Sequence, residues 1–121
     1  MNKRVLIAED EPNIVESLTF LLERNGFDID VAINGMQTLE MISTSLPNLL
    51  ILDVMLPELD GYEVLRRLRA NDHTAELPIL MLTAKGQRED RETALKFGAD
   101  LFLTKPFANA DLIAAVNQLT N

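Results

Sequence analysis

Five polar residues of this sequence stand within two residues of the ends of short apolar runs, where strands are expected to end. They are Glu9, Asp10, Asp53, Thr83 and Lys105. Three carboxylates brought into one crevice repel one another, so a cation is expected among them. Mg²⁺ prefers oxygen ligands, and it usually takes one or two carboxylates together with a substrate phosphate. The set therefore predicts a magnesium site that handles a phosphoryl group.

Asp53 is the nucleophile in this interpretation, because a carboxylate can form a covalent aspartyl phosphate. The hydroxyl of Thr83 and the mobile ammonium of Lys105 both suit phosphoryl oxygens. The backbone carbonyl of Met55, two residues after the acid, offers the metal a further oxygen. These groups together predict phosphoryl transfer to Asp53.

Each of these residues also has a plainer interpretation. Asp53 can cap the next turn, and the pair Glu9 and Asp10 can favour a helix N-terminus through its dipole. Thr83 is a common residue at a strand end, and Lys105 before a proline can be ordinary surface. The site is favoured because residues of the right chemistry reach one edge from four strands.

These residues are positioned by five segments that are expected to be strands, four of them apolar runs and one, Phe27–Ala32, alternating. The segments alternate with five others whose apolar residues recur at helical spacing. The expected strands are Lys3–Ala8, Phe27–Ala32, Leu49–Leu52, Ile79–Leu82 and Leu101–Leu103. The expected helices begin at Pro12, after Asn34-Gly35, at Gly61, before Ala94, and at Asn109 or Asp111. The alternation predicts an α/β fold, a parallel sheet with right-handed crossovers and helices on both faces. Five such units suit a doubly wound sheet of order 2-1-3-4-5, whose strand ends all emerge at one edge.

Two segments are expected to differ from a regular helix. Ala84–Arg91 is polar and contains Gly86, so it is expected to be loop for most of its length. The second helix is expected to carry Met36, Leu39 and Ile42 as its apolar set and to end before Pro47.

Composition limits the classes of function. The 121 residues fit one domain, residues 1–121, and 47% hydrophobic and 25% charged residues are typical of a globular soluble protein. A net charge of −8 argues against direct binding of nucleic acid, which needs a basic face. No apolar run approaches the length of a membrane span, and the absence of cysteine excludes disulfides and thiolate metal sites. The expected location is the cytoplasm.

Four motifs make the sequence resemble a known family. They are VLIAEDE, LLILDVMLPELDGYEVLRRLR, PILMLTA and GADLFLTKPF. The chain resembles, over essentially its whole length, the receiver domain of two-component response regulators, whose fold is flavodoxin-like. The resemblance implies a signalling domain that takes a phosphoryl group from a histidine kinase or phosphotransfer protein. Such a domain catalyses only its own phosphorylation and dephosphorylation, and it controls an output domain or partner.

The resemblance also implies roles for single residues. Asp53 is the phosphoryl acceptor, and Thr83 and Lys105 contact the phosphoryl group. The ligands of Mg²⁺ are Asp10, Asp53 and the Met55 carbonyl, with Glu9 assisting. Phe102 is the aromatic residue whose rotamer reports the switch, and the Lys105-Pro106 peptide bond is expected to be cis.

One departure from the family pattern concerns a homodimer through the fourth helix, fifth strand and fifth helix. The related transcription factors usually carry an arginine where this chain has Ala115, and an acidic pair where it has Asp100-Leu101. Arg91 and Asp111 can still pair across such an interface. Homodimerisation therefore stays open, as does whether the chain acts alone or within a longer regulator.

Three rival functions fit the sequence less well. A phosphohydrolase of the haloacid dehalogenase type needs a second acid at the position of Met55, and methionine cannot transfer a proton. A flavodoxin-like electron carrier needs a phosphate-binding loop and aromatic residues, whereas the first loop here is acidic. An interaction module that works without phosphorylation is expected to lose site residues, and none is lost.

Overall fold

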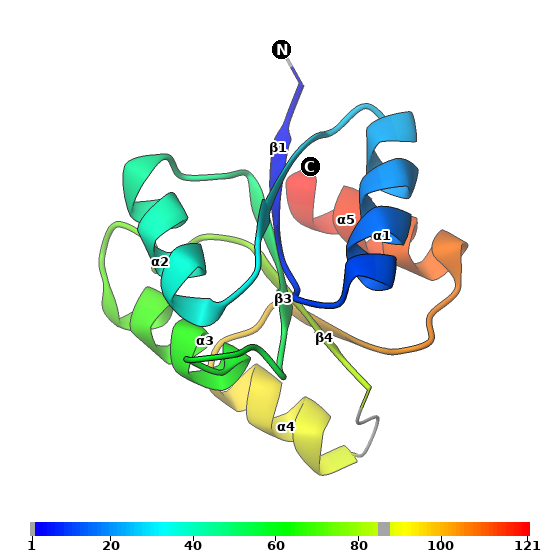
Figure 1. Cartoon of the computed structure of the whole chain (residues 1–121). Coiled ribbons are helices and arrows are strands. Elements are labelled where there is room, and N and C mark those ends of the chain that lie inside the picture. The colour runs from blue at the N-terminus through cyan, green and yellow to red at the C-terminus, as the bar shows by residue number, and fades with distance from the viewer. Residues whose placement is uncertain (1, 85–87) are drawn as a thin grey trace.

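A computed structural model of the chain describes residues 2–84 and 88–121. Its centre is a parallel sheet of five strands in the order β2-β1-β3-β4-β5, which confirms the predicted order (Figure 1). The strands are β1 (Arg4–Ala8), β2 (Asp28–Ala32), β3 (Leu49–Asp53), β4 (Ile79–Thr83) and β5 (Leu101–Thr104). The helices are α1 (Pro12–Arg24), α2 (Gly35–Thr44), α3 (Gly61–Ala70), α4 (Arg88–Lys96) and α5 (Asn109–Thr120).

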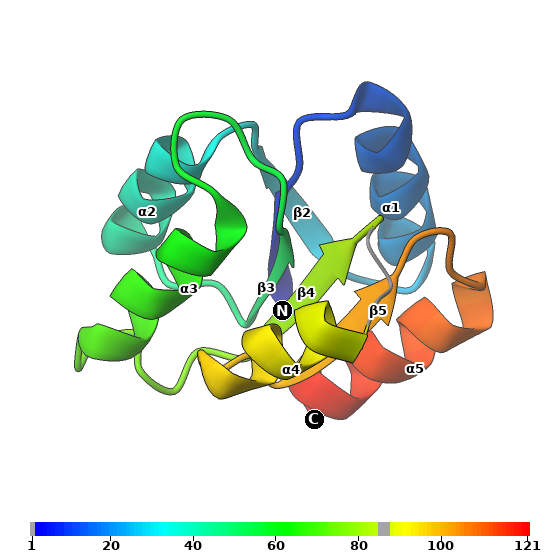
Figure 2. The same cartoon turned by 90° about the horizontal axis from the view of Figure 1, so that it is seen from below.

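The apolar runs are continuous because the sheet is buried on both faces. Side chains alternate along a strand, so Val5 and Ile7 of β1 pack with α1 and α5, whereas Leu6 packs with α2 and α3. Figures 1 and 2 show α1 and α5 on one side of the sheet and α2, α3 and α4 on the other. The protein therefore has two hydrophobic cores, one on each face of the sheet.

Several helix ends follow from local sequence signals. Pro12 occupies the start of α1, where its missing N–H costs nothing. The side chain of Asn34 accepts a hydrogen bond from the N–H of Gln37 (2.7 Å), and Asp60 accepts one from Glu63 (3.0 Å). These two side chains therefore cap α2 and α3. The loops before both helices follow parallel strands, so they lie at the same edge of the sheet.

Two expectations about helices are wrong in part. α4 begins at Arg88, so the second half of the segment expected to be loop is helical. Its first turn contains Glu89 and Asp90, whose charges favour a helix N-terminus, a signal that apolar periodicity does not carry. Gly86 lies outside the described residues. In α2, Met36 is half exposed, and Thr38 takes the fully buried place.

Strand β2 is one residue shorter than the predicted Phe27–Ala32, since it begins at Asp28 and Phe27 lies buried just before it. Across residues 2–84 and 88–121, none of the helices is long and apolar enough to span a membrane.

Candidate functional site

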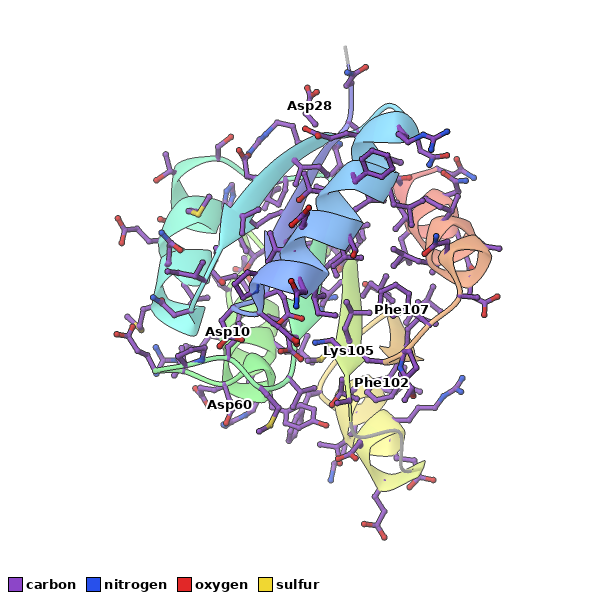
Figure 3. The ribbon with its side chains drawn as sticks, turned by 45° about the vertical axis from the view of Figure 1, so that its right-hand side comes forward. Asp10, Asp28, Asp60, Phe102, Lys105 and Phe107 are labelled. Atoms are coloured by element: carbon purple, nitrogen blue, oxygen red, sulfur yellow. The ribbon has the colours of Figure 1, made fainter. Side chains whose placement is uncertain are left out.

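Strand register brings the predicted site residues to one edge of the sheet. Ala8 of β1 pairs with Leu52 of β3, so Glu9 and Asp53, the residues that follow them, are neighbours. On the other side of β3, Asp53 pairs with Leu82, which places Thr83 at the same edge. The N–H of Lys105 donates to the carbonyl of Thr83 (2.7 Å), so β5 delivers the lysine there too. Figure 3 shows Asp10 and Lys105 at this end of the molecule and Asp28 at the opposite end.

The three carboxylates form a compact cluster. Glu9, Asp10 and Asp53 each place one oxygen within 4.8 Å of the other two. Glu9 and Asp53 are buried, with exposed fractions of 1% and 4%, whereas Asp10 is exposed. The N–H of Asp10 also donates to the Glu9 carboxylate (3.1 Å), which holds the first two acids together. The cluster is therefore open to solvent on one side only.

Lys105 supplies the positive charge of the cluster. Its ammonium donates a hydrogen bond to the Glu9 carboxylate and lies 3.4 Å from an oxygen of Asp53. The lysine side chain is only 12% exposed. Burial by itself lowers the pKa of Lys105, but the hydrogen bond to Glu9 and the charge of Asp53 raise it above its usual value. Lys105 therefore stays protonated and neutralises part of the acidic charge.

The pKa of Glu9 is raised to about 7 from its ordinary value of 4.5. Burial is the largest cause, a hydrogen bond shared with Asp53 adds to it, and Lys105 acts in the opposite direction. Because the pKa is higher in the folded protein, the stabilising contribution of this carboxyl group is complete below pH 4.5. It is lost as the pH rises through about 7, where the folded protein has to ionise a buried acid.

The residues at this edge fit a hard divalent cation. Three carboxylates from two strands converge, one of them is exposed to solvent, and a lysine ammonium already balances two of them. Mg²⁺ binds oxygen ligands, and it usually keeps several waters and binds a phosphate. A site for Mg²⁺ therefore has carboxylates on one side and is open to solvent on the other. The side chain of Met55 is 58% exposed, so any contribution of this residue to the cluster comes from its backbone.

The remaining predicted residues lie beside the cluster. Thr83 is 1% exposed and ends β4, the strand next to Asp53. Phe102 of β5 is partly buried and packs against the core that lies under α2, α3 and α4. The Lys105-Pro106 peptide bond, directly after β5, is cis. The structure thus brings Glu9, Asp10, Asp53, Thr83 and Lys105 together and places Phe102 two strands away from Asp53, on the far side of β4.

Two features of the site do not follow from the sequence pattern. One is the ion pair of Lys105 with Glu9, because the pattern assigns the lysine only to the phosphoryl group. The other is the role of Gly61, whose N–H donates to the carbonyl of Val54 (2.9 Å). A Cβ at Gly61 would lie 2.3 Å from the carbonyl oxygen of Asp53. A glycine just before a helix is a signal for such a close approach.

A family model described as the response regulator receiver domain matches residues 5–117 of the chain. The alkaline phosphatase synthesis transcriptional regulatory protein PhoP of Bacillus subtilis is 44% identical over 119 residues, 98% of this chain and 49% of that protein. The chain therefore spans about half the length of the curated relatives it matches.

Solved structures of receiver domains have the same fold. The Francisella response regulator 1452 receiver domain superposes with a TM-score of 0.92 at 36% identity, covering 98% of this chain and 97% of that chain. The receiver domain of the sensor histidine kinase PA1611 from Pseudomonas aeruginosa has a TM-score of 0.91 at 28% identity, covering 99% and 98%. That structure has a magnesium ion coordinated in its active site cleft.

Proposed function

Because this chain belongs to the response regulator receiver domain family, we propose that it accepts a phosphoryl group on Asp53 in a Mg²⁺-dependent reaction. The observation that carries the proposal is the convergence of Asp53 with two further carboxylates and Lys105 at the carboxyl edge of the sheet. Ligands of open α/β sheets bind at this edge. The donor is a histidine kinase or a phosphotransfer protein, and small donors such as acetyl phosphate replace it in the test tube.

The reaction is a displacement at phosphorus. A carboxylate oxygen of Asp53 forms a bond to phosphorus while the bond from phosphorus to the donor breaks, and the donor leaves with that electron pair. With acetyl phosphate the leaving group is acetate. Lys105 lies 3.4 Å from Asp53 and pairs with a phosphoryl oxygen, and Thr83 donates to another.

When bound, Mg²⁺ would neutralise charge that develops on the phosphoryl oxygens. Asp10, Asp53 and the carbonyl of Met55 would hold the ion, and Glu9 would assist. Glu9 is buried and shares Lys105 with Asp53, so its main part is to orient the lysine and to add negative charge behind the two ligands.

The domain serves signalling and acts only on its own phosphoryl group. The phosphorylated form changes the surface of α4, β5 and α5, and this surface controls an output domain or partner. On this surface the chain has Leu101 and Ala115 where the related transcription factors usually carry an acid and an arginine, and Ala115 is buried in the chain itself. The cytoplasmic location and the lack of direct nucleic-acid binding by these 121 residues stay predictions.

Intact-mass measurement after treatment with acetyl phosphate tests the proposal. We expect the mass of one phosphoryl group to be added when Mg²⁺ is present and none to be added when a chelator removes it. Phosphoryl uptake that is equally fast with the chelator would contradict the metal-dependent reaction.

Mg²⁺ is expected to stabilise the fold, because it relieves the repulsion among Glu9, Asp10 and Asp53. Thermal melts at pH 8, where Glu9 is ionised, should show a higher midpoint with millimolar Mg²⁺ than with a monovalent salt of equal ionic strength. Asp10→Asn should raise the midpoint without metal and reduce the response to Mg²⁺. Identical midpoints in both salts would count against a metal site at this edge.

Gly61→Ala is expected to slow phosphoryl uptake about 10- to 100-fold, since a misplacement of about 1 Å at a reacting group costs that much. The added Cβ would lie 2.3 Å from the Asp53 carbonyl oxygen and would push the acceptor away from its neighbours. Gly26→Ala is the matched control, because Gly26 has φ +89° but no atom within 4 Å of an added Cβ. Both variants should lose stability, and only Gly61→Ala should react slowly. Equal rates in the two variants would show that the close approach is unimportant.

A further inference from the structure

One face of α3 is lined by three residues that contact α4 and the turn after it. Tyr62, Arg66 and Arg69 are spaced by four and three residues, so they lie in one row along the helix. We call these three residues the α3 stripe. Figures 1 and 2 show α4 beside α3 on the same face of the sheet. The stripe contacts α4 near both of its ends, and the two contacts differ in strength.

The contact at the C-terminal end of α4 is made by Arg69. Its Nε donates to the carbonyl of Gly98 (2.8 Å), two residues after the helix, and another nitrogen donates to Asp100 (3.1 Å). The same guanidinium also donates to the carbonyls of Thr74, Ala75 and Leu77. Asp100 in turn accepts from the N–H of Ile79 at the start of β4 (2.8 Å). The arginine is 18% exposed, so this end of α4 is fastened to α3 and β4 by a mostly buried network.

Among residues 2–84 and 88–121, a hydrogen bond from Tyr62 joins α3 to the N-terminal end of α4. The hydroxyl of Tyr62 donates to the carbonyl of Asp90, in the first turn of α4, at 3.3 Å. This distance is longer than the roughly 2.5–3.0 Å usual for a hydroxyl donor, so the hydrogen bond is weak. The pKa of Tyr62 is raised by burial and by the charges of Asp90 and Asp60, so the hydroxyl keeps its proton and donates at neutral pH.

Aromatic packing surrounds that hydrogen bond. The ring of Tyr62 meets the ring of Phe97 edge to face, with centroids 6.0 Å apart and planes at 73°. The guanidinium of Arg66 lies 5.9 Å from the same Phe97 ring. Both contacts are to Phe97, just beyond α4, whereas the Tyr62 hydroxyl contacts the first turn of α4 directly.

Tyr62 is also connected to the phosphoryl acceptor by rigid structure. It follows Gly61, whose backbone packs against the carbonyl of Asp53 and whose N–H donates to Val54 (2.9 Å). The capping bond of Asp60 fixes the same turn of α3. Tyr62 therefore keeps its place relative to Asp53, and a movement of the first turn of α4 has to break its bond to Asp90.

We propose that the α3 stripe sets the resting position of α4, with Arg69 as a pivot at the C-terminal end and the Tyr62 hydroxyl as a latch at the N-terminal end. The proposal rests on the proposed function, because phosphorylation of Asp53 is the event that opens the latch. Tyr62 is then a positioning residue that opposes activation, and it is separate from Thr83 and Phe102.

Amide hydrogen exchange of the unmodified protein tests the latch directly. Tyr62→Phe removes the hydroxyl and keeps the ring on Phe97. Loss of one neutral hydrogen bond should raise the exchange of amides 92–94 roughly two- to tenfold. Amides 97–99 at the pivot should stay unchanged. Unchanged exchange at both ends would overturn the latch, and an equal rise at both ends would overturn the pivot.

Thr93→Val is the matched control. Thr93 lies in the same helix, and its hydroxyl donates to the carbonyl of Glu89 (2.8 Å), so the variant also removes one hydroxyl bond. It leaves the contact of α4 with α3 intact. With Mg²⁺ but no phosphoryl mimic, the α4 amide shifts of Tyr62→Phe should move toward those of the wild type bound to beryllofluoride, whereas those of Thr93→Val should not.

The two measurements separate the two proposals. If beryllofluoride does not change the amide shifts of the wild type, the proposed function is contradicted. The difference in hydrogen exchange between the two ends of α4 is measured without a phosphoryl group, so it tests the latch separately. Shifts of Tyr62→Phe that coincide with the resting wild type would overturn the latch even where the wild type responds to the mimic.

Discussion

Asp53→Asn is expected to reduce phosphoryl uptake from acetyl phosphate by at least about 10³-fold, as removal of a nucleophile does. The asparagine has the same shape and stays between Glu9 and Lys105, so the fold and the site are retained. Its amide oxygen is a poor nucleophile and cannot form the acyl phosphate. Intact-mass measurement with Mg²⁺ present should therefore show no added phosphoryl group in the variant.

Asp28→Asn is the control for charge. Asp28 is an exposed acid at the opposite end of the molecule, so the variant removes one negative charge without touching the site (Figure 3). It should take up phosphate like the wild type. Equal uptake by Asp53→Asn and the wild type would place the acceptor at another residue, and Asp10 and Glu9 would be the first to examine.

The fold follows from the sequence because the central strands β1, β3 and β4 are mostly unbroken apolar runs. Strands β3 and β4 are buried at every position, and such runs favour a sheet covered on both faces. Proline, glycine and capping residues then mark where α1, α2 and α3 begin. The convergence of Asp53 and Lys105 follows from the same pattern, because parallel strands end at a common edge.

The contacts within the site do not follow from the pattern. Whether Lys105 faces Glu9 or solvent depends on how the chain after β5 turns, and no local signal records that. Arg69 looks like one of several charged residues on α3, and its burial is decided by carbonyl groups from the turns after α3 and α4. The start of α4 is missed because its first turn depends on charge and not on apolar spacing.

Thr83→Ala is expected to separate phosphorylation from switching. Asp53 and Lys105 are unchanged, so the variant should still accept a phosphoryl group. The phosphoryl group adds roughly −1.5 to −2 charges beside Thr83 and Lys105. We expect the buried Thr83 hydroxyl to rotate toward the phosphoryl oxygens and so to make room for the ring of Phe102.

The size of the effect follows from the free energy that a complete switch needs. Moving a population from 1:99 to 99:1 takes about 5.5 kcal/mol, and one charge-assisted hydrogen bond supplies about 1.5–3 kcal/mol. Loss of the Thr83 hydroxyl should therefore lower the active-to-resting ratio of the phosphorylated form roughly 10- to 150-fold. Amide shifts of residues 88–107 with beryllofluoride should lie between the resting and active positions.

Thr104→Ala is the matched control, because Thr104 pairs with Thr83 in the register of β4 and β5 but is exposed. The Thr104→Ala variant removes a threonine hydroxyl that lies one strand farther from Asp53, and it should switch like the wild type. Both variants have the same change in side-chain size, so a difference between them reports the position of the hydroxyl. If Thr83→Ala reaches the wild-type shifts, the coupling element has to be Lys105 alone. One ion pair would then supply the whole 5.5 kcal/mol or so of the switch, more than a charge-assisted bond usually gives.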